Sequence, residues 1–139
     1  SIEPSDLKIL GVAADSGSKG QQVFEALALL VAVRLWMPRL LELRPRFVVK
    51  SDNLSVLFLL TRMQTPSESL GIIARELALD LVAASFLPDV VQHVPGVANG
   101  LADSLARLKE GKQIPSLLSS ALRREPPVRD HQWWRSLRD

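Results

Sequence analysis

Apolar residues recur three or four positions apart in two long stretches, and this spacing predicts the two main helices. The first stretch is Gln21–Met37, which has no internal Gly or Pro and is followed by Pro38. The second begins at Thr65, where the order Thr-Pro-Ser-Glu has the form of a capping box, and continues to about Phe86. Because the first helix has little polar surface, we expect most of it to be buried.

Short runs of β-branched residues predict two strands. They cover Arg46–Asp52 and Val90–Val94, and each ends in residues that favour turns. Shorter helices are expected over Leu54–Met63 and over Gly100–Leu108. The predicted order is helix, strand, helix, helix, strand, helix, which is typical of an α/β fold.

Two strands are too few to close such a fold. A sheet of this size leaves its edges open and much of the helix surface uncovered. The sheet must therefore be completed by the first twenty residues, by a partner chain, or by sequence outside this chain. Leu7–Ala14 is the candidate within the chain, as a short strand or an irregular apolar segment.

Composition excludes several classes of site. A chain of 139 residues fits one domain, and the absence of cysteine excludes disulfides, thiolate zinc sites and cysteine nucleophiles. Two histidines are too few for a histidine-rich metal site. No apolar run approaches the length of a membrane span, and the first residues do not resemble a signal peptide. We therefore expect an intracellular protein, in the cytoplasm or the nucleus, without a membrane partner.

Charge is distributed unevenly along the chain. Residues 1–106 carry nine Lys or Arg and eleven Asp or Glu, whereas residues 107–139 carry eight and four. This division suggests a domain over residues 1–108 and a basic C-terminal tail or linker over 109–139. In the tail, Arg123 and Arg124 are candidates for phosphate contacts, and Trp133 and Trp134 are candidates for stacking on bases. The alternative is an ordinary basic linker whose two tryptophans dock on the domain.

The stretch Asp15–Gly20 is a loop by composition, and we considered it as a phosphate-binding loop. A P-loop needs a lysine directly after its second glycine, followed by Ser or Thr. Here Lys19 precedes Gly20, and neither Ser nor Thr follows. The loop therefore does not match that motif.

Three carboxylates stand at positions where α/β proteins assemble their sites. Glu25 lies on the first long helix, Asp52 lies at the end of a predicted strand, and Asp103 lies on the helix that follows the second strand. Carboxylates that converge need a cation to stay ionised together. Oxygen ligands of this kind suit Mg²⁺ or Mn²⁺, and two such ions can assist phosphodiester cleavage.

Four segments in this order resemble a known family. They are Phe24–Leu30, Ser51-Asp52-Asn53, Ile73–Leu77 and His93–Arg107, the last containing His-Val-Pro-Gly and an Asn four residues before an Asp. Together they resemble the ribonuclease H domain of LTR-type retrotransposon reverse transcriptases. The resemblance covers residues 22–108.

The resemblance implies a fold and an activity. The fold would be an α/β, ribonuclease H-like mixed sheet of five strands flanked by helices. The activity would be metal-dependent hydrolysis of the RNA strand in RNA–DNA hybrids. Glu25, Asp52 and Asp103 would be the catalytic ligands of Mg²⁺ (or Mn²⁺), and Asn53 and Asn99 would contact the substrate. A reverse transcriptase domain of the same polyprotein would be a partner.

The sequence departs from the family before Glu25. The family has three strands there, the first with a further Asp, but only 24 residues precede Glu25. Three strands and their hairpins need about 30–40 residues. The first strands are thus missing or degenerate, and we expect impaired cleavage. Two alternatives stay open, namely a non-catalytic relic that binds nucleic acid or packs against protein, and an unrelated helical interaction protein.

Overall fold

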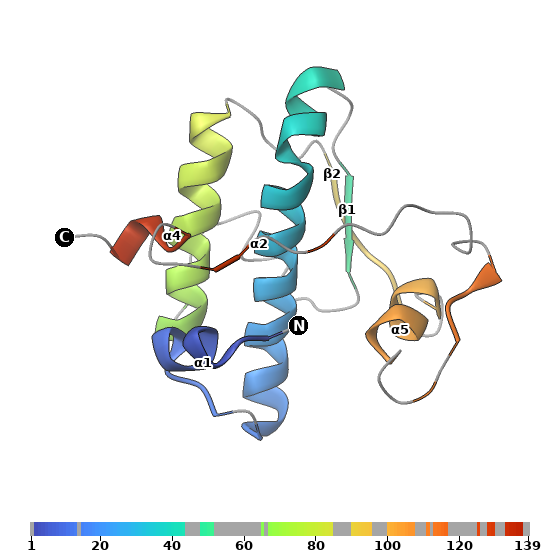
Figure 1. Ribbon diagram of the computed structural model, residues 1–139, viewed down its shortest axis with the longest axis horizontal. Helices are drawn as coiled ribbons and strands as arrows, with labels where there is room; N and C mark the ends of the chain where they lie inside the picture. The colour runs from blue at the N-terminus through green and yellow to red at the C-terminus, as the bar shows by residue number, and fades with distance from the viewer. Residues whose placement is uncertain are drawn as a thin grey trace.

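The computed structural model describes most of the chain. The described residues are 2–13, 15–43, 48–51, 65, 67–84, 90–95, 100–107, 111, 113–116, 125, 128–129 and 133–137. Within them, two long helices stand side by side, and a short helix lies near one end of the pair (Figure 1). The predicted helix over Leu54–Met63 lies outside these residues.

The N-terminal part of the chain forms two helices. Helix α1 covers Pro4–Leu10, with Pro4 in its first turn and Gly11 in the left-handed conformation directly after it. Helix α2 covers Gly17–Leu43 and is the longest element. None of the described helices combines the length and the apolar character that a membrane span requires.

Helix α4 covers Glu68–Ala83 and is the centre of the packing. It contacts α2, α1 and the short 3₁₀ helix η4, Arg135–Leu137. The core lies between α2 and α4, where Leu30, Ile73 and Leu77 are fully buried. Removing apolar side chains of this size from water contributes about 1.5–3 kcal/mol each, so this interface is the main source of stability.

Two short strands lie beyond the helices. Strands β1 (Val48–Ser51) and β2 (Val90–His93) pair in parallel, with Val48 opposite Val90. Helix α5 (Gly100–Ala106) follows β2 and lies on the opposite side of α2 from α4 in Figure 1. Leu101 and Leu105, one turn apart on α5, are both exposed.

The predicted α/β fold of the ribonuclease H type is wrong. The described residues are mostly helical and contain one pair of strands, not a mixed sheet flanked by helices. The reason lies in the residues before Glu25, which form α1 and the start of α2 instead of strands. Without a sheet to cover, α2 and α4 bury their apolar faces against each other.

Three local predictions also need correction. Leu7–Ala14 is not a strand, because its first part belongs to α1. Pro38 does not end the first long helix, which continues to Leu43. The hydroxyl that caps α4 belongs to Ser67, which accepts a hydrogen bond from the backbone N–H of Leu70 at 3.4 Å, and Thr65 instead accepts from the Ser67 N–H.

Pro38 is an exposed residue inside α2, and replacing it tests this helix. Proline cannot donate the helical hydrogen bond to the carbonyl of Arg34, and its ring crowds that carbonyl. We expect Pro38→Ala to raise the free energy of unfolding by up to about 3 kcal/mol in urea titrations. Pro4→Ala, at the start of α1 where proline is favoured, is the control and should bring no gain. An unchanged or lower stability of Pro38→Ala would contradict a continuous α2.

Candidate functional site

The structure describes one of the three predicted metal ligands as a side chain. Glu25 lies on α2, half-buried, and its Oε1 accepts a hydrogen bond from Gln21 Nε2 at 3.0 Å. Asp103 belongs to α5, but its side chain is outside the description, and so is all of Asp52. The described residues therefore do not place these three carboxylates relative to one another.

Among the described residues, the groove around Glu25 contains no second carboxylate. Besides Gln21, its neighbours in the same groove are mainly apolar, including Phe24, Ala28 and Val31. Mg²⁺ needs a near-octahedral set of oxygen ligands, and these neighbours offer no carboxylate. No group of three or more His, Cys, Asp or Glu is placed to hold a metal ion within the described part of the chain. The Mg²⁺ or Mn²⁺ site stays a prediction.

The residues predicted to contact the substrate divide into two groups. Asn53, Asn99, Arg123 and Arg124 lie outside the described residues. Trp133 and Trp134 are described, and both belong to the core, with 8% and 3% of their surface exposed. In this state neither ring is accessible for stacking on a base. The two tryptophans dock on the domain, which is the alternative that the sequence left open.

Arg34 connects α2, α4 and the C-terminal residues. Its Nε donates to Asp80 Oδ2 at 2.6 Å, and its Nη2 donates to Glu76 Oε2. Its Nη1 donates to the backbone carbonyl of Trp133. Glu76 and Asp80 are one turn apart on α4, and both side chains are buried. One guanidinium on α2 thereby satisfies three groups, two from α4 and one from the C-terminal residues.

The C-terminal residues complete this cluster from the other side. Arg135 forms an ion pair with Asp80, and the backbone N–H of Ser136 donates to Glu76 Oε1 at 2.5 Å. The Trp133 ring lies 4.2 Å below the Arg34 guanidinium, which is a cation–π arrangement. Trp134 contacts Trp133 edge to face, with ring centroids 4.9 Å apart.

A second buried ion pair joins the same C-terminal segment to α1. Arg129 Nε donates to both carboxylate oxygens of Asp6, at 2.9 and 2.7 Å, and the two side chains are 1% and 0% exposed. The Asp6 carboxylate also accepts from the backbone N–H of Glu3 at 2.9 Å. Arg129 and Arg135 therefore pair with acids from α1 and from α4, and we call the described residues 129 and 133–137 the C-terminal strap.

The strap changes the ionisation of Glu76. Burial alone would raise the pKa of this carboxyl, but hydrogen bonds from Ser136 and Arg34 outweigh burial and hold the pKa below its ordinary value of 4.5. Glu76 is therefore ionised in the folded protein at neutral pH. Its role is structural, because its oxygens are occupied by groups of the chain itself.

Our interpretation of the sequence missed this cluster. A signal was present, because Arg34 interrupts an otherwise apolar helix, and Glu76 and Asp80 lie beside the apolar stripe of α4. Charged residues at such positions are rarely buried unless they are paired. The pattern does not indicate which partner each charge has, since the groups lie 42 or more residues apart along the chain.

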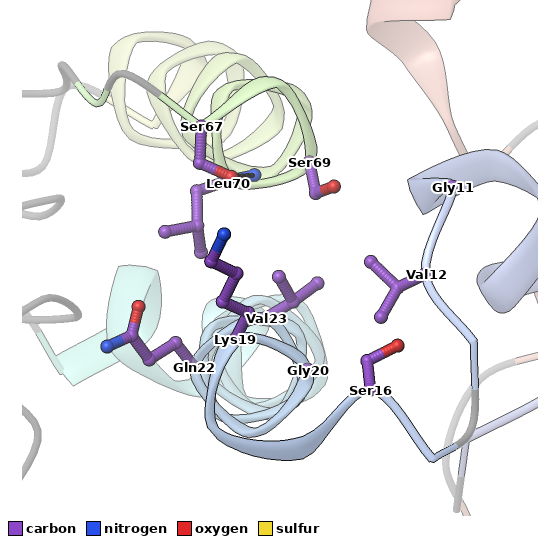
Figure 2. Close-up of a pocket in the computed structure, with 10 residues that line it drawn as sticks. All are labelled: Gly11, Val12, Ser16, Lys19, Gly20, Gln22, Val23, Ser67, Ser69 and Leu70. Carbon is purple, nitrogen blue, oxygen red and sulfur yellow. Dashed lines mark hydrogen bonds between the residues drawn. The ribbon is translucent and has the colours of Figure 1, made fainter.

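A cavity of about 530 Å³ lies where α1, α2 and α4 meet. Figure 2 shows Lys19 pointing from the first turn of α2 toward Ser67 and Leu70 at the start of α4. Two hydroxyls that line the cavity form hydrogen bonds to backbone carbonyls. Ser16 donates to the Ala13 carbonyl at 2.5 Å, and Ser69 donates to the Leu10 carbonyl at 2.6 Å. We assign this cavity a structural role as the junction of the helices.

A groove of about 540 Å³ runs along the face of α2 that carries Glu25. Ala28 and Ala32, one turn apart, are exposed small residues in it, and the larger side chains of Phe24, Leu35 and Trp36 also line it. Trp36 is 45% exposed. From Phe24 to Trp36 the groove extends over about 18 Å of helix, at 1.5 Å per residue. This is a mainly apolar surface with one carboxylate, and Arg129, whose buried side chain is paired with Asp6, also borders it.

Comparison with known proteins gives no relative, since no family model, curated protein or solved structure matches the chain.

The buried cluster predicts a large effect of Glu76→Gln. Removing one charge from a buried network leaves its partners incompletely compensated, so we expect a loss of about 3 kcal/mol in the free energy of unfolding. The control is Glu42→Gln, because Glu42 pairs with Arg39 at 2.8 Å but both side chains are more than half exposed. That substitution should cost less than about 0.5 kcal/mol in the same denaturant titration. Equal effects would show that the Arg34 cluster is not buried in solution.

The lowered pKa of Glu76 predicts a loss of stability in acid. The unfolded carboxyl titrates near 4.5 and the folded one at a lower pH, so its stabilisation is complete above 4.5. As the pH falls from 4.5 through the folded pKa, the unfolded state takes up the proton first and the stabilisation is lost. We expect the melting temperature of the wild type to fall more steeply in this range than that of Glu76→Gln. Parallel curves would contradict this assignment, and Glu42→Gln should keep the wild-type slope.

Proposed function

We propose that this chain is a protein-interaction module that binds an amphipathic helix of a partner along the α2 groove. The observation that carries this proposal is the groove itself, an open apolar surface on the longest helix. Contiguous apolar surface on a soluble protein marks interaction sites. This corresponds to the helical interaction protein that we left open from the sequence.

The shape and charge of the groove favour a helix as the partner. Ala28 and Ala32 allow another backbone to approach closely, while Phe24, Leu35 and Trp36 offer larger side chains for packing. Glu25 is the carboxylate of this surface, so a basic residue beside the apolar stripe of the partner would complement it. A stripe of apolar residues with a flanking Lys or Arg is the chemistry we expect.

Hydrolysis of RNA–DNA hybrids, which the resemblance implies, is the competing function. Against it stand the mainly apolar neighbours of Glu25 and the burial of Trp133 and Trp134. In addition, Arg129 and Arg135 of the basic tail are paired with acids of the chain. The described tail residues that could recognise nucleic acid are thus used inside the domain, whereas the α2 groove is open.

The groove is tested by Ala32→Glu, which places a charged side chain in it without removing a core residue. We expect the wild-type chain to enhance the fluorescence of anilinonaphthalene sulfonate. Ala32→Glu should reduce this fluorescence enhancement at least two-fold. Helical peptides selected on the wild type from a displayed library should lose at least ten-fold in affinity for Ala32→Glu. Ala102→Glu, an equally exposed alanine on α5, is the matched control and should behave as wild type.

The same proteins are then incubated with an RNA–DNA hybrid and Mg²⁺ or Mn²⁺. We expect no cleavage above a protein-free control. Cleavage that is lost in Glu25→Gln would overturn the proposal in favour of the nuclease. Selected peptides that bind wild type and Ala32→Glu equally would show that partners do not use the α2 groove.

A further inference from the structure

The C-terminal strap packs against residues of α1, α2 and α4, and we call the surface formed by Asp6, Arg34, Glu76 and Asp80 the cleft. Within the strap, η4 lies beside α4 (Figure 1). The strap binds through two arginines six residues apart, the Trp133–Trp134 pair and two backbone groups. Its only regular structure among the described residues is the three-residue η4.

The cleft and the strap have opposite charge. The cleft offers the carboxylates of Asp6, Glu76 and Asp80, and the strap offers Arg129 and Arg135. Arg34 is the cation that α2 contributes to the cleft. The arrangement is that of a receptor for a short cationic and aromatic peptide, with the ligand attached to the same chain.

The fit of the strap is incomplete. The indole N–H groups of Trp133 and Trp134 are buried without a hydrogen-bond partner in the described structure. A buried donor without a partner disfavours the buried state, and water would satisfy both groups if the strap left. Leu30, Ile73 and Leu77 are buried between α2 and α4, and Trp133 and Trp134 join the same core from the strap.

We propose that the cleft between α1, α2 and α4 is a peptide-binding site that exchanges its own strap for the C-terminal segment of a second copy of this chain. In an exchange, every ion pair and aromatic contact of the strap is reproduced between two chains. A tethered strap has an effective concentration on the order of millimolar, so the internal ligand wins at low protein concentration. A weakened strap frees the site for an external segment. This inference does not depend on the α2 groove.

The test uses full-length protein and a fluorescein-labelled peptide of residues 125–139, followed by fluorescence anisotropy. Trp134→Ala weakens the internal ligand, and we expect this variant to bind the peptide at least ten-fold more tightly than the wild type does. A peptide in which Arg129 and Arg135 are replaced by alanine should bind the variant at least ten-fold more weakly. Leu101→Ala removes an exposed apolar side chain on α5, which lies in neither the cleft nor the α2 groove, and it should match the wild type.

Two results would overturn the proposal. One is a Trp134→Ala protein with wild-type helix content by circular dichroism that does not bind the peptide. The other is binding that does not change when the two arginines of the peptide are replaced. If Trp134→Ala loses its helices, Arg135→Ala provides the same test with a milder change, because this side chain is 42% exposed. Loss of helix content in both variants would make the strap an integral part of the core and reject exchange.

Discussion

The position of Arg34 decides how this fold is held together. A guanidinium on an apolar helix cannot be buried without partners, and here α4 supplies two carboxylates and the strap supplies a carbonyl and an aromatic face. The groups depend on one another, since without Arg34 Glu76 would lose its ion pair and Asp80 would keep only its pair with Arg135 among the described residues. The hydrophobic interface provides most of the free energy, but this cluster determines which faces of α2 and α4 meet.

The orientation of α2 that buries Arg34 also determines which side of the helix is exposed. Once Arg34 faces α4 and the strap, the opposite side of the helix, with Phe24, Ala28 and Trp36, forms the α2 groove, which only Ile2 and Arg129 border from other described segments. A mixed sheet would have covered such a face, but the residues before Glu25 form helices. The open groove and the missing sheet are therefore two consequences of the same N-terminal sequence.

Local patterns predicted the elements better than their assembly. The helix over Gln21–Met37, the strand near Val48 and the helix that follows Thr65 were all found, because spacing and β-branching act within a few residues. Assembly into a sheet depends on contacts between distant segments, which periodicity does not report. The Arg34 cluster could not be predicted for the same reason, since the sequence indicates that the charges need partners but not which partners they have. Of the candidate site, the structure describes Glu25 and the two strap tryptophans, and the tryptophans lie inside the fold.

The division of charge along the chain has a physical reason in the structure. A basic tail after a slightly acidic body resembles a nucleic-acid-binding extension, because phosphates attract Lys and Arg. Buried carboxylates attract the same residues, and they do so more strongly where water is excluded. Arg129 and Arg135 neutralise Asp6 and Asp80, which would otherwise be charges in the interior. The positive charge of these two arginines therefore compensates the negative charge of the carboxylates that the body buries. A nucleic-acid partner is not needed to explain their presence in the tail.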